Sequence, residues 1–323
     1  MSRVRLTVTL QMDPEVAAAM TPLTDAAAGT TPPLPGDWQT RRAAVNQLIT
    51  QVTSDWAPPA DVEVNEFSAV AEDGTPIPMR LYRKSGASSG SLVVYIHGGG
   101  MFLCSIDTHD PICRRYTADS GVPLLSVDFR FAPEHPYPTS VEDCYAALRW
   151  AANHAVDLAV DPDRIAIMGD SAGGGMAAGV ALMARDRGGP TLRSQILICP
   201  MLDDRTTVPD PEIESLVTWS TDDNITGWSC LLGDAAGGDD VPSYAAPARE
   251  SDLVGLPPAY IEVGQLDIFR SEDLEYADRL SQAGVGVELH LHPAVPHAFE
   301  VFAPQSAVAR RAMADRVRTL KSL

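Results

Sequence analysis

Short apolar runs typical of buried strands alternate along this chain with segments of helical periodicity, and this alternation restricts the possible folds more than any other feature. The strand-like runs lie at 91–96, 123–129, 164–168, 194–199, 259–263 and 287–292. Helical patterns occupy 140–155, 172–187 and 271–284. Strands that alternate with helices in this way predict the α/β class, with a mostly parallel central sheet flanked by helices.

The chain of 323 residues contains no long polar linker, so we expect a single domain over residues 1–323 with helical additions. Residues 1–55 contain two helical patterns, begun by Asp13 and Asp37, and are predicted to form a cap or lid over the sheet. Residues 203–250 are rich in Asp, Pro and Gly and are predicted to add a second part of the cap. Two runs within them, 213–220 and 226–233, have the pattern of short helices.

The composition excludes several classes of partner. The formal net charge of −19 argues against nucleic acids and anionic membranes, which are themselves negative. No apolar run reaches the ~18 residues of a membrane span, and the amino terminus lacks the apolar core of a secretory signal, which predicts a cytoplasmic protein. The five cysteines have neither C-x-x-C nor zinc-finger spacing, which favours reduced thiols and no metal site. The expected partner is therefore a small molecule.

The heptapeptide GDSAGGG places Ser171 two residues from a glycine on either side, in G-x-S-x-G spacing. Ser171 follows the strand predicted at 164–168 and precedes the helix predicted at 172–187. A strand, a sharp turn and a helix are the setting in which such a serine acts as a nucleophile. The alternative, a polar residue in a glycine-rich loop, does not require this setting. Asp170 is expected to support the turn by hydrogen bonding.

A serine hydroxyl needs a base to accept its proton, and histidine is the usual one. His297 follows the strand predicted at 287–292, so it can reach the same edge of the sheet as Ser171. Asp267 lies four residues beyond the strand at 259–263 and is predicted to orient the imidazole. His290 and His292 lie within the strand at 287–292 and are expected to be structural. His109, His135 and His154 are expected to be surface or helix residues.

The segment HGGGMF, residues 97–102, follows the strand at 91–96. Its glycine N–H groups, with the N–H of Ala172, are predicted to form an oxyanion hole, which stabilises negative charge on a carbonyl oxygen. The alternatives are a simple glycine turn or a dinucleotide loop, but the chain lacks both G-K-[ST] and the dinucleotide fingerprint. The order Ser, Asp, His also excludes a trypsin-like protease, in which His and Asp precede Ser.

Five segments in this order, HGGG, DFRFAPEHPYP, GDSAGGG, GQLDIFRSED and VPHAF, resemble the hormone-sensitive-lipase family of α/β-hydrolase esterases in its bacterial branch. The resemblance covers about residues 60–323. It implies the α/β-hydrolase fold with a helical cap, and a triad of Ser171, Asp267 and His297. It also implies an oxyanion hole in which Gly99, Gly100 and Ala172 donate their N–H groups, with His97 and Gly98 shaping the loop. Arg130, Pro133 and Glu134 are then structural residues that support the site, here called the buttress residues.

The same resemblance implies a serine carboxylesterase that hydrolyses short- to medium-chain acyl esters through an acyl-enzyme, without metal or cofactor, as a monomer or a homodimer. Amide or lactone hydrolysis by the same triad is an alternative. A non-catalytic binding protein is a further alternative that the presence of His297 disfavours. In this family the N-terminal helices form part of a lid, so we expect an acyl pocket lined by Trp38, Met101, Phe102, Leu216 and Trp219.

The chain departs from the family pattern at three places. Met101 stands directly after HGGG, where the family usually has an aromatic residue. Ile268 and Phe269 replace the usual Pro-Leu after Asp267, and Ala298 replaces the glycine after the histidine. None of these changes removes a catalytic atom, so they bear on the pocket rather than on the triad.

Overall fold

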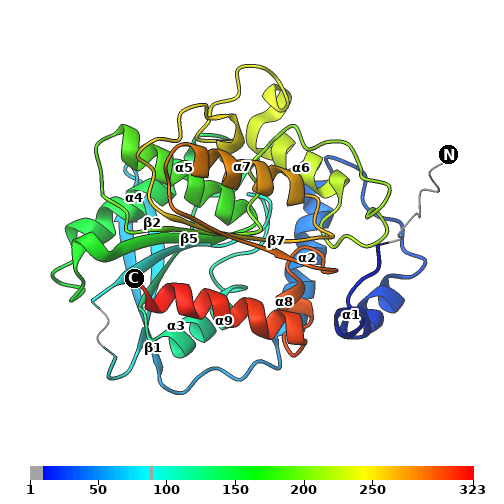
Figure 1. Ribbon diagram of the computed structural model, residues 1–323, viewed down its shortest axis with the longest axis horizontal. Helices are drawn as coiled ribbons and strands as arrows, with labels where there is room; N and C mark the ends of the chain where they lie inside the picture. Colours follow the sequence, from blue (N-terminus) through cyan, green and yellow to red (C-terminus); the bar gives the residue numbers. More distant parts are fainter. Residues whose placement is uncertain (1–9, 88–89) are drawn as a thin grey trace, which may run out of the picture.

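The computed structural model describes residues 10–87 and 90–323. One eight-stranded sheet runs through it in the order β1-β2-β4-β3-β5-β6-β7-β8 (Figure 1). Its strands are β1 (Val62–Val70), β2 (Pro76–Lys84), β3 (Leu92–Ile96), β4 (Leu124–Val127), β5 (Ile165–Asp170), β6 (Gln195–Ile198), β7 (Ala259–Gly264) and β8 (Val287–His292). Strands β3 to β8 pair in parallel, whereas β2 pairs antiparallel with β1 and β4. The predicted mostly parallel sheet is confirmed.

Helices cover both faces of the sheet. They are α1 (Pro14–Ala27), α2 (Trp38–Thr53), α3 (Asp110–Ser120), α4 (Thr139–Asn153), α5 (Ala172–Asp186), α6 (Thr221–Leu232), α7 (Arg270–Gln282), α8 (Phe299–Phe302) and α9 (Ala307–Lys321). In Figure 1, α4, α5 and α7 lie on one face, and α3 and α9 lie on the other. Three short 3-10 turns occur at 162–164, 233–235 and 247–249.

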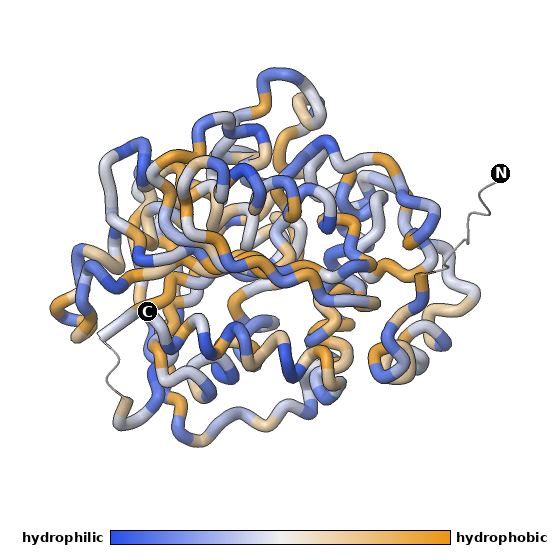
Figure 2. The backbone as a smooth tube through the Cα atoms, viewed as in Figure 1, coloured by the Kyte–Doolittle hydropathy of each residue, from blue (hydrophilic) through white to orange (hydrophobic). Residues whose placement is uncertain are grey.

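Strand β3 shows why the central strands read as continuous apolar runs. Its five side chains are at most 1 % exposed. Because side chains alternate across a sheet, Leu92, Val94 and Ile96 pack into the core beneath α4 and α5, whereas Val93 and Tyr95 pack into the core beneath α3 and α9. Burial on both faces requires apolar residues at every position. Figure 2 shows the resulting hydrophobic band along the middle of the molecule.

The predicted helix at 213–220 is wrong. These residues form turns, and helix α6 begins only at Thr221. Ser220 and Asp223 exchange hydrogen bonds as a capping box, in which each side chain accepts from the backbone N–H of the other residue. This pair satisfies N–H groups at the start of α6, so the helix begins at Thr221, five residues after Leu216. The second predicted run, 226–233, lies in the C-terminal half of α6.

The N-terminal helices are attached to loops that follow the strands. On α1, Val16 is fully buried against Val295 and Phe299. On α2, Arg41 forms an ion pair with Asp223 of α6. Residues 1–9 of the expected cap lie outside the described residues. Across 10–87 and 90–323, no helix combines the length and apolar character needed to cross a membrane.

Candidate active site

Ser171 occupies a sharp turn between β5 and α5. Its backbone has φ +54° and ψ −124°, a region that non-glycine residues rarely adopt and that costs conformational energy. Glycines allow the turn to form, because a Cβ at Gly169 would collide with the carbonyl of Gly173, and a Cβ at Gly173 would collide with that of Ile96. The spacing G-x-S-x-G is therefore a packing requirement of this strand–turn–helix unit.

The ends of β6 and β7 hold this turn in place. The N–H of Ser171 donates to the carbonyl of Ile198 at 2.8 Å, and the carbonyl of Ser171 accepts from the N–H of Met201 at 2.9 Å. Cys199, between these two residues, donates its N–H to the carbonyl of Glu262 in β7 at 2.7 Å. The serine turn is thus tied, through the end of β6, to the strand that precedes Asp267.

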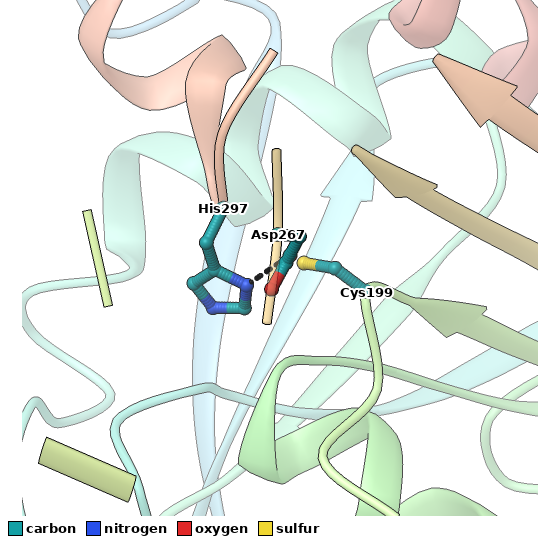
Figure 3. A group of neighbouring side chains, drawn as sticks. All are labelled: Cys199, Asp267 and His297. Carbon is teal, nitrogen blue, oxygen red and sulfur yellow. Dashed lines mark hydrogen bonds and ion pairs between the residues drawn. The ribbon is translucent and has the colours of Figure 1, made fainter. Parts of the chain in front are cut away.

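Asp267 and His297 meet although 30 residues separate them. His297 Nδ1 lies 2.6 Å from Asp267 Oδ2 (Figure 3). Asp267 Oδ1 accepts the N–H of Phe269 at 3.0 Å. They meet because β7 and β8 are parallel neighbours, so the loops that follow them share one edge of the sheet. Asp267 is 1 % exposed and His297 7 %. With Nδ1 bound to the carboxylate, Nε2 is left free to accept a proton.

The surroundings of His297 raise its pKa above the ordinary 6.5. Burial alone lowers the pKa, because it disfavours the charged imidazolium. The charge of Asp267 and its hydrogen bond act in the opposite direction and outweigh burial, with further help from the charges of Glu300 and Asp170. The imidazolium is therefore stabilised, as expected of a base that must hold a proton during a reaction.

The glycine loop after β3 lies directly against the serine turn. A Cβ at Gly98 would lie 2.5 Å from Asp170 Oδ2 and 3.2 Å from Ser171 Cβ. Gly99 and Gly100 have φ of +124° and +57°, which favour glycine. Ala172 is the first residue of α5, so its N–H has no partner within the helix. The loop therefore meets the serine turn at Gly98, and the oxyanion role of Gly99, Gly100 and Ala172 stays a prediction.

A buried polar cluster supports the turn from behind. Asp170 accepts a hydrogen bond from the Tyr95 hydroxyl and lies 3.5 Å from His109 Nε2. Burial lowers the pKa of His97 to about 3, and the neighbouring His109 adds to this effect, so His97 is neutral. The expectation that His109 is a surface or helix residue is wrong, because it is 5 % exposed and packs its ring 5.1 Å from that of His97.

The buttress residues form ion pairs with the surrounding chain. Arg130 donates to both carboxylate oxygens of the buried Asp143, with its Nη2 at 2.7 Å from Oδ1. Glu134 pairs with Arg42 at 2.6 Å, and Arg42 also donates to the carbonyl of Ala132 at 3.0 Å. These contacts fix the segment after β4 to helix α4 through Asp143 and to helix α2 through Arg42.

The five residues expected to line the acyl pocket do not all line one cavity. Phe102 and Trp219 pack together with ring centroids 6.4 Å apart, and a Cβ at Gly100 would touch Trp219. Met101 lines a small cavity beside Ala172. Trp38 stacks beneath the Arg42 guanidinium at 4.4 Å. Leu216 is half-buried in the loop before α6, and its place in the pocket stays a prediction.

Sequence reasoning missed several residues of this region. The cavity beside Ala172 is also lined by Met176 and Trp228, and the periodicity of the run 226–233 was the available signal for Trp228. Thr218 donates to the carbonyl of His297 at 2.5 Å. Cys199 lies beside Asp267 and His297 in Figure 3, and no sequence motif marks it.

Comparison with known proteins gives a consistent result. A family model described as alpha/beta hydrolase fold matches residues 93–301. The chain is 39% identical over 267 residues to the carboxylesterase NlhH of Mycobacterium tuberculosis (strain ATCC 25618 / H37Rv), covering 79% of this chain and 82% of that protein. It is 31% identical over 241 residues to an ethyl acetate hydrolase of Pseudomonas putida, covering 73% of this chain and 75% of the relative.

Solved structures extend the similarity to almost the whole chain. A bacterial heroin esterase has a TM-score of 0.86 and 35% identity, covering 97% of this chain and 98% of that structure. An esterase from the archaeon Pyrobaculum calidifontis has a TM-score of 0.85 and 33% identity, covering 97% of this chain and 99% of that structure. With its eight-stranded sheet, its serine turn and these relatives, the chain belongs to the α/β-hydrolase family, in the branch that resembles hormone-sensitive lipase.

Proposed function

We propose that the protein is a serine carboxylesterase that hydrolyses short- to medium-chain acyl esters through an acyl-enzyme intermediate. The observation that carries the proposal is the 2.6 Å hydrogen bond from His297 to Asp267, at the edge of the sheet where Ser171 occupies its strained turn. The relatives named carboxylesterase, ethyl acetate hydrolase and esterase support the same class of reaction. A small ester is the proposed substrate.

The proposed reaction has two steps. Ser171 Oγ attacks the ester carbonyl while His297 Nε2 takes the hydroxyl proton, and the N–H groups of Gly99, Gly100 and Ala172 stabilise the oxyanion. The alcohol then leaves with the proton from His297. Water, deprotonated by His297, cleaves the acyl-enzyme and releases the carboxylic acid and the free serine. Asp267 keeps the Nδ1 proton in place throughout.

The cap is part of the same proposal. Helices α1, α2 and α6, with the loop 203–220, would close over the site and separate the acyl-enzyme from bulk water. The Arg41 ion pair with Asp223 joins α2 to α6, and Thr218 joins the second part of the cap to the loop of His297. We expect these contacts to fix the position of the cap relative to the triad.

Release of p-nitrophenol from acetate, butyrate, octanoate and palmitate esters tests the proposed function. We expect the highest kcat/KM on the shorter esters, because the cavity beside Ala172 is small and bounded by bulky side chains such as Met176 and Trp228. Matched anilides and lactones run in parallel distinguish ester from amide or lactone hydrolysis. A folded protein that hydrolyses none of the four esters would overturn the proposal.

The pH profile follows from the raised pKa of His297. Imidazolium cannot accept the serine proton, so kcat/KM should fall as the pH drops through the pKa of His297 in the free protein. Because this pKa lies above 6.5, the midpoint of the acid limb should also lie above pH 6.5. Initial rates on p-nitrophenyl butyrate between pH 4 and 9 measure it. A rate that stays constant down to pH 4 contradicts the assignment of His297 as the base.

Gly100→Ala tests the oxyanion loop. The new Cβ would lie 2.7 Å from Trp219 Cη2 at a backbone φ of +57°, so the loop must move. Since loss of one oxyanion donor costs about 10²–10³-fold in kcat, we expect a decrease of this size with little change in KM. Gly286→Ala is the matched control, because a Cβ there meets nothing within 4 Å. Equal kcat values for the two variants would exclude this role for the loop.

Trp228→Leu tests which side chains limit the acyl chain. Trp228 is 2 % exposed and lines the cavity beside Ala172, so a smaller side chain should admit longer acyl groups. Each additional buried CH₂ is worth ~0.8 kcal/mol, or about fourfold in kcat/KM. We expect the octanoate-to-butyrate ratio to rise by at least tenfold. Trp150→Leu, on α4 beside His154, is the control and should leave the ratio unchanged. A ratio unchanged by Trp228→Leu places the acyl chain elsewhere.

A further inference from the structure

We propose that Cys199, Asp267 and His297 form a binding site for one soft divalent metal ion, such as Zn²⁺ or Cd²⁺, and that the bound ion switches the triad off. The site shares two residues with the triad but is defined by the third, Cys199, which the proposed hydrolysis does not use. The inhibition rests on the proposed esterase function, whereas the binding of the ion does not.

The fold brings the three side chains together from three neighbouring strands. Cys199 follows β6, Asp267 follows β7 and His297 follows β8, and the three strands are parallel neighbours. Cys199 has a backbone φ of +38° and is anchored by its N–H to the Glu262 carbonyl at 2.7 Å. Figure 3 shows its sulfur directed toward the carboxylate of Asp267, with the ring of His297 on the other side.

The donor set suits a soft divalent ion. Thiolate sulfur, imidazole nitrogen and carboxylate oxygen are the ligands of zinc sites, and one ligand atom from each residue lies within 4.8 Å of the others. Tetrahedral ligands at zinc distances lie roughly 3.5 Å apart, so small side-chain rotations complete the geometry. Asp267 can turn Oδ2 toward the ion while Oδ1 keeps the N–H of Phe269.

The donor set can balance the charge of the ion. Cys199 is 6 % exposed, and Asp267 and His297 are similarly buried, so a cation here needs compensating charge. Burial and the charge of Asp267 raise the pKa of the Cys199 thiol, so the ion itself must displace the thiol proton, which passes to water. The resulting thiolate, with the carboxylate of Asp267, supplies two negative charges for the two positive charges of the ion. The nearby Arg316 does not oppose binding, because Glu262 and Glu300 already neutralise it in a buried ion-pair cluster.

A small cavity adjoins two of the three ligand residues. Cys199 and His297 line a cavity of about 30 Å³, which is large enough for a water-sized group. This cavity shares Trp56 and Arg115 with a surface groove of about 900 Å³ between α2 and α3. Water in the cavity can supply the fourth ligand, which a site with three protein ligands leaves open.

The chemical consequence is a change of tautomer. An ion bound at His297 Nδ1 breaks the hydrogen bond to Asp267 and leaves the proton of the neutral imidazole on Nε2. Nε2 then cannot accept the proton of Ser171, so the first step of hydrolysis stops. Only protons move, between the protein and water, and no electron is transferred, so a chelator should restore activity.

Titration of the metal-free protein with Cd²⁺ tests the site directly, because cadmium bound to thiolate gives an ultraviolet charge-transfer absorption. We expect this band to saturate at one ion per chain in the wild type and to be lost in Cys199→Ala. Cys144→Ala is the matched control, since Cys144 is fully buried in α4, and it should keep the band. A band that persists in Cys199→Ala, or that is absent from the wild type, would overturn the site.

Activity measured in the same samples separates binding from function. At 100 times the Kd, we expect Cd²⁺ to lower the activity of the wild type and of Cys144→Ala by about 100-fold, reversibly with EDTA. Cys199→Ala, compared with its own metal-free rate, should lose less than twofold. If the band appears but no ester is hydrolysed without metal, the proposed function fails and the metal site stands. Saturation of the band without loss of activity would overturn the switch.

Discussion

Replacing Ser171 with alanine is expected to lower kcat for ester hydrolysis by about 10⁶-fold. The proposed mechanism transfers the acyl group to Ser171 Oγ, and alanine leaves no atom to receive it. The remaining rate would come from the oxyanion donors and from binding alone. The exchange removes one oxygen from a side chain that is 6 % exposed, so the turn should keep its shape. Release of p-nitrophenol from the butyrate ester measures the loss.

Ser251→Ala provides the matched control, because Ser251 lies exposed in the loop before β7. Both variants should give the circular dichroism spectrum and the melting temperature of the wild type, within a few degrees. Activity of Ser171→Ala within tenfold of the wild type would mean that another residue is the nucleophile.

Replacing Asp267 with asparagine should lower kcat by about 10⁴-fold. Asparagine keeps the shape of the side chain but loses its charge, so His297 is no longer held in the tautomer that leaves Nε2 free. The charge of Asp267 also raises the pKa of His297, so the acid limb of the pH profile should move to lower pH in this variant. A purely structural role for Asp267 would not move the limb in this direction.

The control for Asp267→Asn is Asp278→Asn on the exposed face of α7, where the carboxylate accepts a hydrogen bond from Gln282 at 2.6 Å. It should leave kcat and the pH profile unchanged. An Asp267→Asn protein within tenfold of the wild-type kcat would remove Asp267 from the proposed triad.

The central strands were predictable because burial on both faces requires a continuous run of apolar residues. Strands β3 and β5 to β8 fall within the predicted runs or extend them by one or two residues, and β4 is shorter than its run. Strands β1 and β2 were not predicted. They pair antiparallel at the edge of the sheet and are partly exposed, so charged residues such as Glu63 and Arg80 interrupt the apolar pattern. Helix α9 was also missed, because its four arginines obscure an apolar face.

The candidate site was predictable where a motif reflects a backbone requirement. Gly169 and Gly173 are needed for close packing around Ser171, and the chain order of Ser171, Asp267 and His297 follows the order of their strands. Residues that are placed in the site by long-range packing belong to no local sequence motif. Cys199 is one of five isolated cysteines, and only the neighbouring ends of β6, β7 and β8 place it beside His297.

Covalent labelling tests the central claim most directly. A p-nitrophenyl alkylphosphonate should react once per chain, because the serine oxygen attacks phosphorus, p-nitrophenolate leaves, and the oxyanion donors hold the phosphoryl oxygen. Mass spectrometry of the intact protein and of its peptides gives the number of labels and their position. The account predicts one label on Ser171, and none in Ser171→Ala. A label on any other residue, or an unlabelled wild type, would contradict it.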